Sequence, residues 1–154
     1  MNALFAASLA IAATASAAGA AQAPAAPASP TVEQLQTARF TGMHMAATLL
    51  NRGIKAAVAN HRDVREQVHE AEGLAYWGAS IPGLFPAGSG GGESSARPEI
   101  WTNWGDFEAK ATDLRRAAGR LAGLARAGDT AGFATQAAAV EAACAACHTA
   151  YRAD

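Results

Sequence analysis

A Cys-x-x-Cys-His motif close to the C-terminus constrains this chain more than any other feature. Its members are Cys144, Cys147 and His148, and no other cysteine occurs in the 154 residues. Two thiols at this spacing can form thioether bonds to the two vinyl groups of one porphyrin edge, and the histidine that follows can then reach the iron. The motif therefore predicts one covalently attached haem c, with His148 as a ligand of its iron.

Other uses of two neighbouring cysteines fit the sequence less well. A Cys-x-x-Cys redox pair is typical of a βαβ context, and no strand pattern surrounds this one. A structural zinc site takes about four protein ligands and a catalytic site three, whereas the motif offers three and no second cysteine cluster exists. A disulfide between Cys144 and Cys147 would be strained and would leave His148 unexplained.

Both cysteines fall on the apolar face of a predicted helix that runs from Thr130 to about Arg152. Apolar residues recur there in steps of four and three, which is helical periodicity. The repeating positions are Phe133, Ala137, Val140, Cys144, Cys147 and Tyr151. Because the cysteines belong to this face, we expect the haem inside a helical bundle, near the C-terminal helix, and not on a surface loop.

Three more helices are predicted upstream, and they lead to an all-α fold. Helical periodicity runs from Thr31 to about Ala59, from His61 to about Ala79, and from Pro98 to Gly128. Asn60 can cap the second of these helices, and Asp129 can cap the last helix of the chain. Residues 81–98 are rich in glycine and proline and predict a long crossover loop. Together these patterns predict an antiparallel four-helix bundle.

The N-terminal residues carry no charge and are interpreted separately. Residues 1–23 combine an apolar core with Ala-x-Ala sites, as in a secretory signal peptide. Residues 24–30 form a Pro/Ala linker, and 31–154 form the folded domain. We therefore expect a periplasmic protein with no stable membrane span after signal removal. A formal net charge of −1 gives no indication of a nucleic-acid partner.

From residue 31 onward the chain resembles the class II c-type cytochromes, the cytochrome c prime family. The resemblance rests on the run from Cys144 to Arg152, with support from Leu84–Ser89, Pro98–Trp101 and Gly128-Asp129. It implies a monohaem four-helix bundle, often a homodimer through its first two helices. It also implies that Arg39 lies near a haem propionate, that Arg152 lies near the proximal face, and that position 43 faces the distal side of the iron.

Position 43 decides which mechanism the resemblance implies. Family members with an apolar non-ligand there are five-coordinate and bind nitric oxide or carbon monoxide, whereas low-spin members use a methionine ligand. Met43 can bind iron through its thioether, although a methionine at such a position can also fill a core. His44, rotated by about 100° on the helix, is expected to point away from the haem.

We therefore predict a low-spin electron carrier of this family and not an enzyme. Cys144 and Cys147 would hold the haem, His148 and Met43 would ligate the iron, and Arg39 would neutralise a propionate. The expected partners are periplasmic redox proteins, and a homodimer is possible. The alternative is a five-coordinate cytochrome c prime that binds nitric oxide or carbon monoxide.

Overall fold

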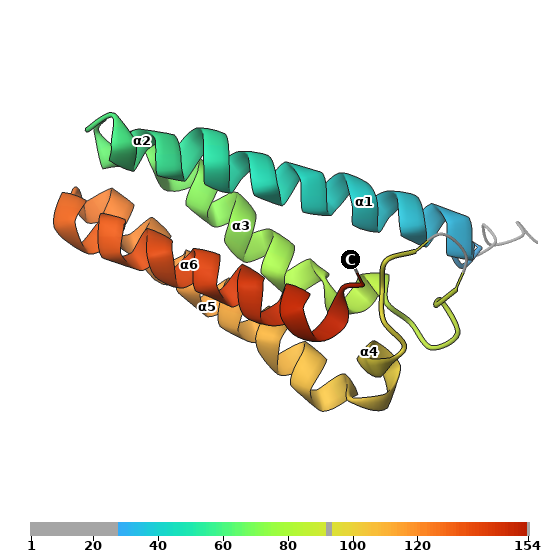
Figure 1. Cartoon of the computed structure of the whole chain (residues 1–154). Helices are drawn as coiled ribbons and strands as arrows, with labels where there is room; N and C mark the ends of the chain where they lie inside the picture. Colours follow the sequence, from blue (N-terminus) through green and yellow to red (C-terminus); the bar gives the residue numbers. More distant parts are fainter. Residues whose placement is uncertain (1–27, 92–93, 154) are drawn as a thin grey trace, which may run out of the picture.

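The computed structural model describes residues 28–91 and 94–153, and these form an antiparallel four-helix bundle (Figure 1). The predicted signal peptide and most of the predicted linker lie outside the described residues. The first helical segment comprises α1 (Val32–Thr48), the π-helix η1 (Leu49–Lys55) and α2 (Ala56–Ala59), and the second comprises the 3-10 helix η2 (Val64–Gln67) and α3 (Val68–Ser80). The third is α5 (Trp104–Ala127) and the fourth is α6 (Thr130–Tyr151), with η3 (Pro82–Leu84) and α4 (Glu99–Thr102) in the crossover between α3 and α5. The predicted fold is confirmed.

Side-chain caps set two of the predicted helix starts. Thr31 accepts a hydrogen bond from the backbone N–H of Gln34, whose side chain accepts one from the N–H of Thr31, so α1 begins with a full capping box. Asp129 likewise caps α6 by accepting from the N–H of Gly132. Asn60 does not cap the second segment as predicted, because Asp63 takes that role three residues later.

The first helix also departs from the expected uniform α-helix. Residues 49–55 form a π-helix, a wider turn in which backbone hydrogen bonds span five residues. Gly53 lies in this turn, and a Cβ atom there would come within 2.7 Å of the Cγ atom of Glu70 on α3. The missing side chain therefore lets the π-helical turn pack closely on the second segment.

The core lies mainly between α3, α5 and α6. The apolar faces of α5 and α6 are buried there. Cys144 and Cys147 are half-buried at the C-terminal end of the apolar face of α6.

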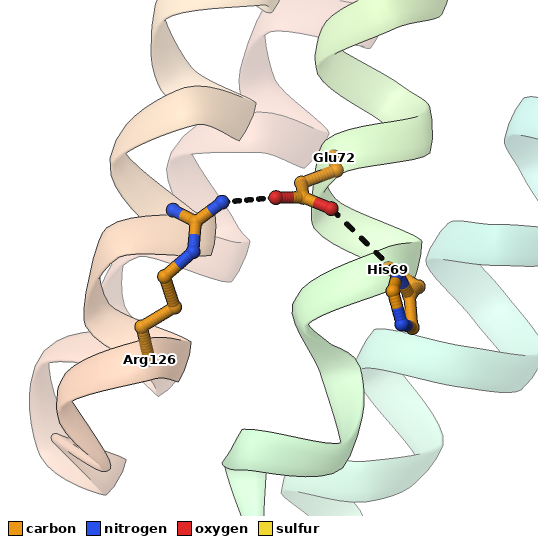
Figure 2. Close-up of polar contacts among 3 residues, drawn as sticks. All are labelled: His69, Glu72 and Arg126. Atoms are coloured by element: carbon orange, nitrogen blue, oxygen red, sulfur yellow. Dashed lines mark hydrogen bonds and ion pairs between the residues drawn. The ribbon is translucent and has the colours of Figure 1, made fainter.

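On the surface, Glu72 of α3 bonds to Arg126 of α5 and lies 3.6 Å from the exposed ring of His69 (Figure 2). Such an exposed pair contributes little to stability. Among the described helices, none is long and apolar enough to cross a membrane.

Helices α3 and α5 lie close together at Gly78. A Cβ atom at this buried glycine would lie 2.8 Å from the backbone nitrogen of Arg115 and 3.2 Å from the carbonyl oxygen of Ala111. Backbone atoms cannot rotate away as a side chain does. The glycine is therefore required by the distance between the two helices.

We predict that Gly78→Ala lowers the free energy of unfolding by about 1–3 kcal/mol, because the added methyl group pushes the two helices apart. Gly119→Ala on α5 is the matched control, since a Cβ there meets nothing within 4 Å. The control should be neutral or slightly stabilising, because it only reduces the freedom of the unfolded chain. Chemical denaturation of both variants checks this, and equal stability of the two would contradict the close packing.

Candidate haem site

A cavity of about 680 Å³ lies between α1, the crossover and the last turns of α6. Here α1 stands apart from the C-terminal end of α6 (Figure 1). The cavity is of the size that proteins use for small organic ligands and cofactors. Its lining includes Arg39, Phe40, Met43 and His44 from α1, Phe85 and residues 94–96 from the crossover, and Cys147, His148, Tyr151 and Arg152 from the C-terminal end.

The structure brings four of the five predicted site residues to this cavity: Arg39, Met43, Cys147 and His148. Cys144 is not among its lining residues. It lies one helical turn before Cys147 on α6, half-buried against the hydrophobic core. Residues three apart on a helix share a face, so the two thiols lie along one side of α6, as attachment to one porphyrin edge requires.

Burial shifts the pKa of each titratable side chain in the Cys-x-x-Cys-His motif. Loss of hydration raises the pKa of both thiols, with the charge of Glu141 adding to the effect at Cys144. Burial, followed by the nearby charge of Arg152, lowers the pKa of His148. The lowered pKa favours the neutral imidazole, and this is the form that binds iron.

The remaining lining suits a haem. Apolar side chains, among them Met43, Phe85, Ile100 and Phe107, offer contacts for a flat apolar ring. Arg39 and Arg152 offer positive charge for carboxylates, and no Asp or Glu occurs among the described residues that line the cavity. The residues present therefore fit an apolar macrocycle that carries acidic groups on one edge.

Tyr151 fastens the turn of α6 that carries His148. The Tyr151 hydroxyl donates a hydrogen bond of 2.6 Å to Oδ2 of Asp106 on α5, and the tyrosine ring packs edge-on against Phe107, with ring centroids 5.3 Å apart. The hydrogen bond lowers the pKa of Asp106 and raises the pKa of Tyr151 to about 12. This pair carries no sequence signature, because only the fold brings positions 106 and 151 together.

One residue on α1, His44, differs from the sequence-based expectation, and a second, Arg39, has partners that the sequence did not predict. His44 does not point away from the site: it lines the cavity beside Met43 and stacks on the exposed ring of Phe40, with centroids 6.4 Å apart. The cavity is wide enough that two adjacent residues of α1, Met43 and His44, both line it. Helical periodicity alone places adjacent residues on different faces and so did not predict this. Arg39 is buried and hydrogen-bonds to the crossover loop at Leu84 and Ser89. Its predicted contact with a propionate stays a prediction.

A four-helix bundle with Cys-x-x-Cys-His in its last helix and a cavity beside that motif defines a c-type haem protein. The sequence profile of the family described as Cytochrome C' matches residues 34–152. The chain therefore belongs to the cytochrome c' family and binds one covalently attached haem c.

Individual relatives agree with this assignment. The cytochrome c' of Pararhodospirillum photometricum is 32% identical over 119 residues, which cover 76% of this chain and 90% of that protein. The crystal structure of cytochrome c' from Thermochromatium tepidum superposes with a TM-score of 0.76 at 31% identity, covering 82% of this chain and all of that one. A nitric oxide complex of a mutant of cytochrome c prime from Alcaligenes xylosoxidans is 28% identical with a TM-score of 0.73, covering 80% and 96%.

These relatives overturn one prediction. A six-coordinate electron carrier with Met43 and His148 as iron ligands is contradicted, because the relatives are cytochromes c' and their solved structures include nitric oxide and carbon monoxide complexes. A gas complex requires an iron position that no side chain holds permanently. The ability of a thioether to bind iron does not show that it does so, since methionine packs equally well as an apolar wall.

We predict that Tyr151→Phe destabilises the haem-loaded protein most between about pH 4 and pH 10. The hydrogen bond lowers the pKa of Asp106, so the stability that it gives the folded protein is lost as the pH falls through that pKa. It raises the pKa of Tyr151, so this stability is also lost as the pH rises toward about 12. Thermal unfolding of both proteins from pH 3 to pH 11 checks the prediction, because the stability difference should shrink toward both ends of this range. A stability difference that stays constant from pH 3 to pH 11 would contradict it.

Proposed function

We propose that this chain is a five-coordinate cytochrome c' that binds nitric oxide or carbon monoxide reversibly, without chemical turnover. Cys144, Cys147 and His148 would hold the haem, and the iron would supply the coordination chemistry for the gas in the part of the cavity lined by Met43. The observation that carries the proposal is that mutants of one relative of the same fold, the cytochrome c prime of Alcaligenes xylosoxidans, form complexes with nitric oxide and with carbon monoxide. A carbon monoxide-bound variant from Alcaligenes xylosoxidans matches at 28% identity and a TM-score of 0.73.

The cavity lining explains a preference for small neutral ligands. The bound haem supplies the iron that coordinates the gas. Met43 is half-buried against the core and presents an apolar side chain to the cavity, so it restricts the size of what enters. His148 is kept neutral by burial and by Arg152, so it remains available as a ligand near pH 7.

We predict that Met43→Ala speeds carbon monoxide binding to the reduced protein by about tenfold or more, because it removes an apolar obstacle beside the open position. The matched control is Met45→Ala, since Met45 is 59% exposed and lines a different hollow of the molecule. Flash photolysis measures both association rates. If carbon monoxide leaves the spectrum of the wild-type protein unchanged yet binds to Met43→Ala, Met43 closes the site and the proposal fails.

We further propose that the protein works in the periplasm. The support is the predicted signal peptide at residues 1–23 together with a haem type that bacteria attach outside the cytoplasm. Fractionation of cells that express the full chain tests this. Haem-loaded protein in the periplasmic fraction supports the proposal, and haem-loaded protein confined to the cytoplasm contradicts it.

We also propose a homodimer through α1 and α3. A hollow of about 900 Å³ between these helices includes Gly42, Ala46 and Gly73, and the exposed Met45 and Tyr76 stand at its edge. The exposed apolar side chains of Met45 and Tyr76 beside this hollow offer a surface that a second copy of the chain can cover. One solved cytochrome c', 26% identical with a TM-score of 0.76, is described as having a ligand-controlled dimer dissociation.

Met45→Asp should shift this dimer toward monomer by at least tenfold in dissociation constant, because it places a charge in an apolar interface. Thr48→Asp adds the same charge to an exposed position of α1 outside the hollow and serves as the control. Sedimentation equilibrium compares the two. Equal effects of both substitutions, or a monomeric wild-type protein, would contradict an interface at this place.

A further inference from the structure

Arg39 is the most unusual residue on α1, because it is charged and only 5% exposed. Its guanidinium makes three hydrogen bonds, all to the crossover. Nε donates to the carbonyl oxygen of Leu84 at 2.7 Å, one terminal nitrogen donates to the carbonyl oxygen of Ser89 at 3.0 Å, and the other donates to the Ser89 hydroxyl at 2.5 Å. A buried charge is costly unless it is bonded in this way, so the crossover satisfies Arg39 and is held by it.

Ser89 receives two of these bonds and is itself 2% exposed. Its hydroxyl also donates a hydrogen bond of 2.7 Å to the carbonyl oxygen of Pro86, and its N–H donates to the same oxygen at 3.1 Å. Residues 86–89 thus form a tight turn whose polar groups are directed at one another and at Arg39. Among the described residues, Arg39 is the only buried cation.

Phe85 connects this arrangement to the haem cavity. The guanidinium carbon of Arg39 lies 4.2 Å from the centre of the Phe85 ring, a cation–π contact. The other edge of Phe85 packs on Phe107, with centroids 5.1 Å apart, and both rings line the cavity. Trp101 donates its indole N–H to the carbonyl oxygens of Phe85 and Pro86. The phenyl ring is therefore fixed on one side by Arg39 and on the other by the bundle.

We propose that Arg39 is a positioning residue that acts on the haem cavity through the crossover: it clamps residues 84–89 onto α1 and so fixes Phe85 as a cavity wall. This role differs from that of a charge partner for a propionate, which the resemblance implies. Three of the five guanidinium N–H groups are already used by the crossover. The proposal concerns how the haem cavity is built and is independent of whether the iron binds a gas.

The two roles make different demands on residue 39. A charge partner needs a positive charge, which lysine keeps. A clamp needs several donors in a fixed planar fork, which only arginine has. Arg39→Lys therefore separates the two roles without removing charge. Ser89→Ala removes one acceptor of the clamp and leaves Arg39 itself unchanged, so it tests the same network from the other side.

The experiment uses the haem-loaded protein and compares Arg39→Lys, Ser89→Ala and the control Arg52→Lys, an exposed arginine on η1. Hydrogen exchange followed by mass spectrometry reports on the peptide that covers residues 84–89. We expect exchange there to become at least about tenfold faster in Arg39→Lys and severalfold faster in Ser89→Ala, as the loss of hydrogen bonds to a charged group predicts. Arg52→Lys should match the wild-type protein.

Circular dichroism in the Soret region supplies the second measurement, since this signal depends on the side chains packed around the haem. Arg39→Lys and Ser89→Ala should both alter this signal, because Phe85 is no longer fixed in either variant. Full protection of residues 84–89 in Arg39→Lys would overturn the clamp, as would a Ser89→Ala variant identical to wild type. Faster exchange with an unchanged Soret signal would show that the crossover is not a wall of the haem site. If Arg39→Lys fails to retain haem, Ser89→Ala decides by the same two measurements.

Discussion

The attachment of a flat cofactor to one helical turn is the constraint on which the rest of this structure depends. Cys144, Cys147 and His148 lie on the last turns of α6, so a haem held by them would extend from that helix toward α1. Packing α1 tightly on α6 would leave no room for it. The bundle instead forms its core between α3, α5 and α6, and keeps a cavity of about 680 Å³ beside the motif.

That cavity needs walls that the helices alone do not provide, and the crossover supplies them. Residues 94–97 pair with the chain end after α6 through the backbone hydrogen bonds from Arg97 to Tyr151 and from Ala153 to Ser95. Residues 84–89 close the side toward α1 through Arg39. The described parts of this crossover, residues 84–89 and 94–97, are thus held in place by residues that line the haem site, among them Arg39 and Tyr151.

Local rules made much of this predictable from the sequence. The periodicity of α5 and α6, the caps at Thr31 and Asp129 and the haem motif all depend on residues close together in the chain. What could not be predicted depends on contacts between distant segments. The partners of Arg39 lie about 45–50 residues away, and the Asp106–Tyr151 hydrogen bond spans 45. Met43 shows a different limit, because its chemistry permits both ligation and packing, and only comparison with relatives favours packing.

If His148 is the one protein ligand of the iron, as we propose, the iron stays open on the side of Met43. Electron paramagnetic resonance of the oxidised, haem-loaded protein at neutral pH distinguishes this from ligation by Met43, because the spin state follows the number and strength of the axial ligands. We expect a spectrum dominated by high-spin iron that Met43→Leu leaves essentially unchanged. A low-spin spectrum that becomes high-spin only in Met43→Leu would contradict it.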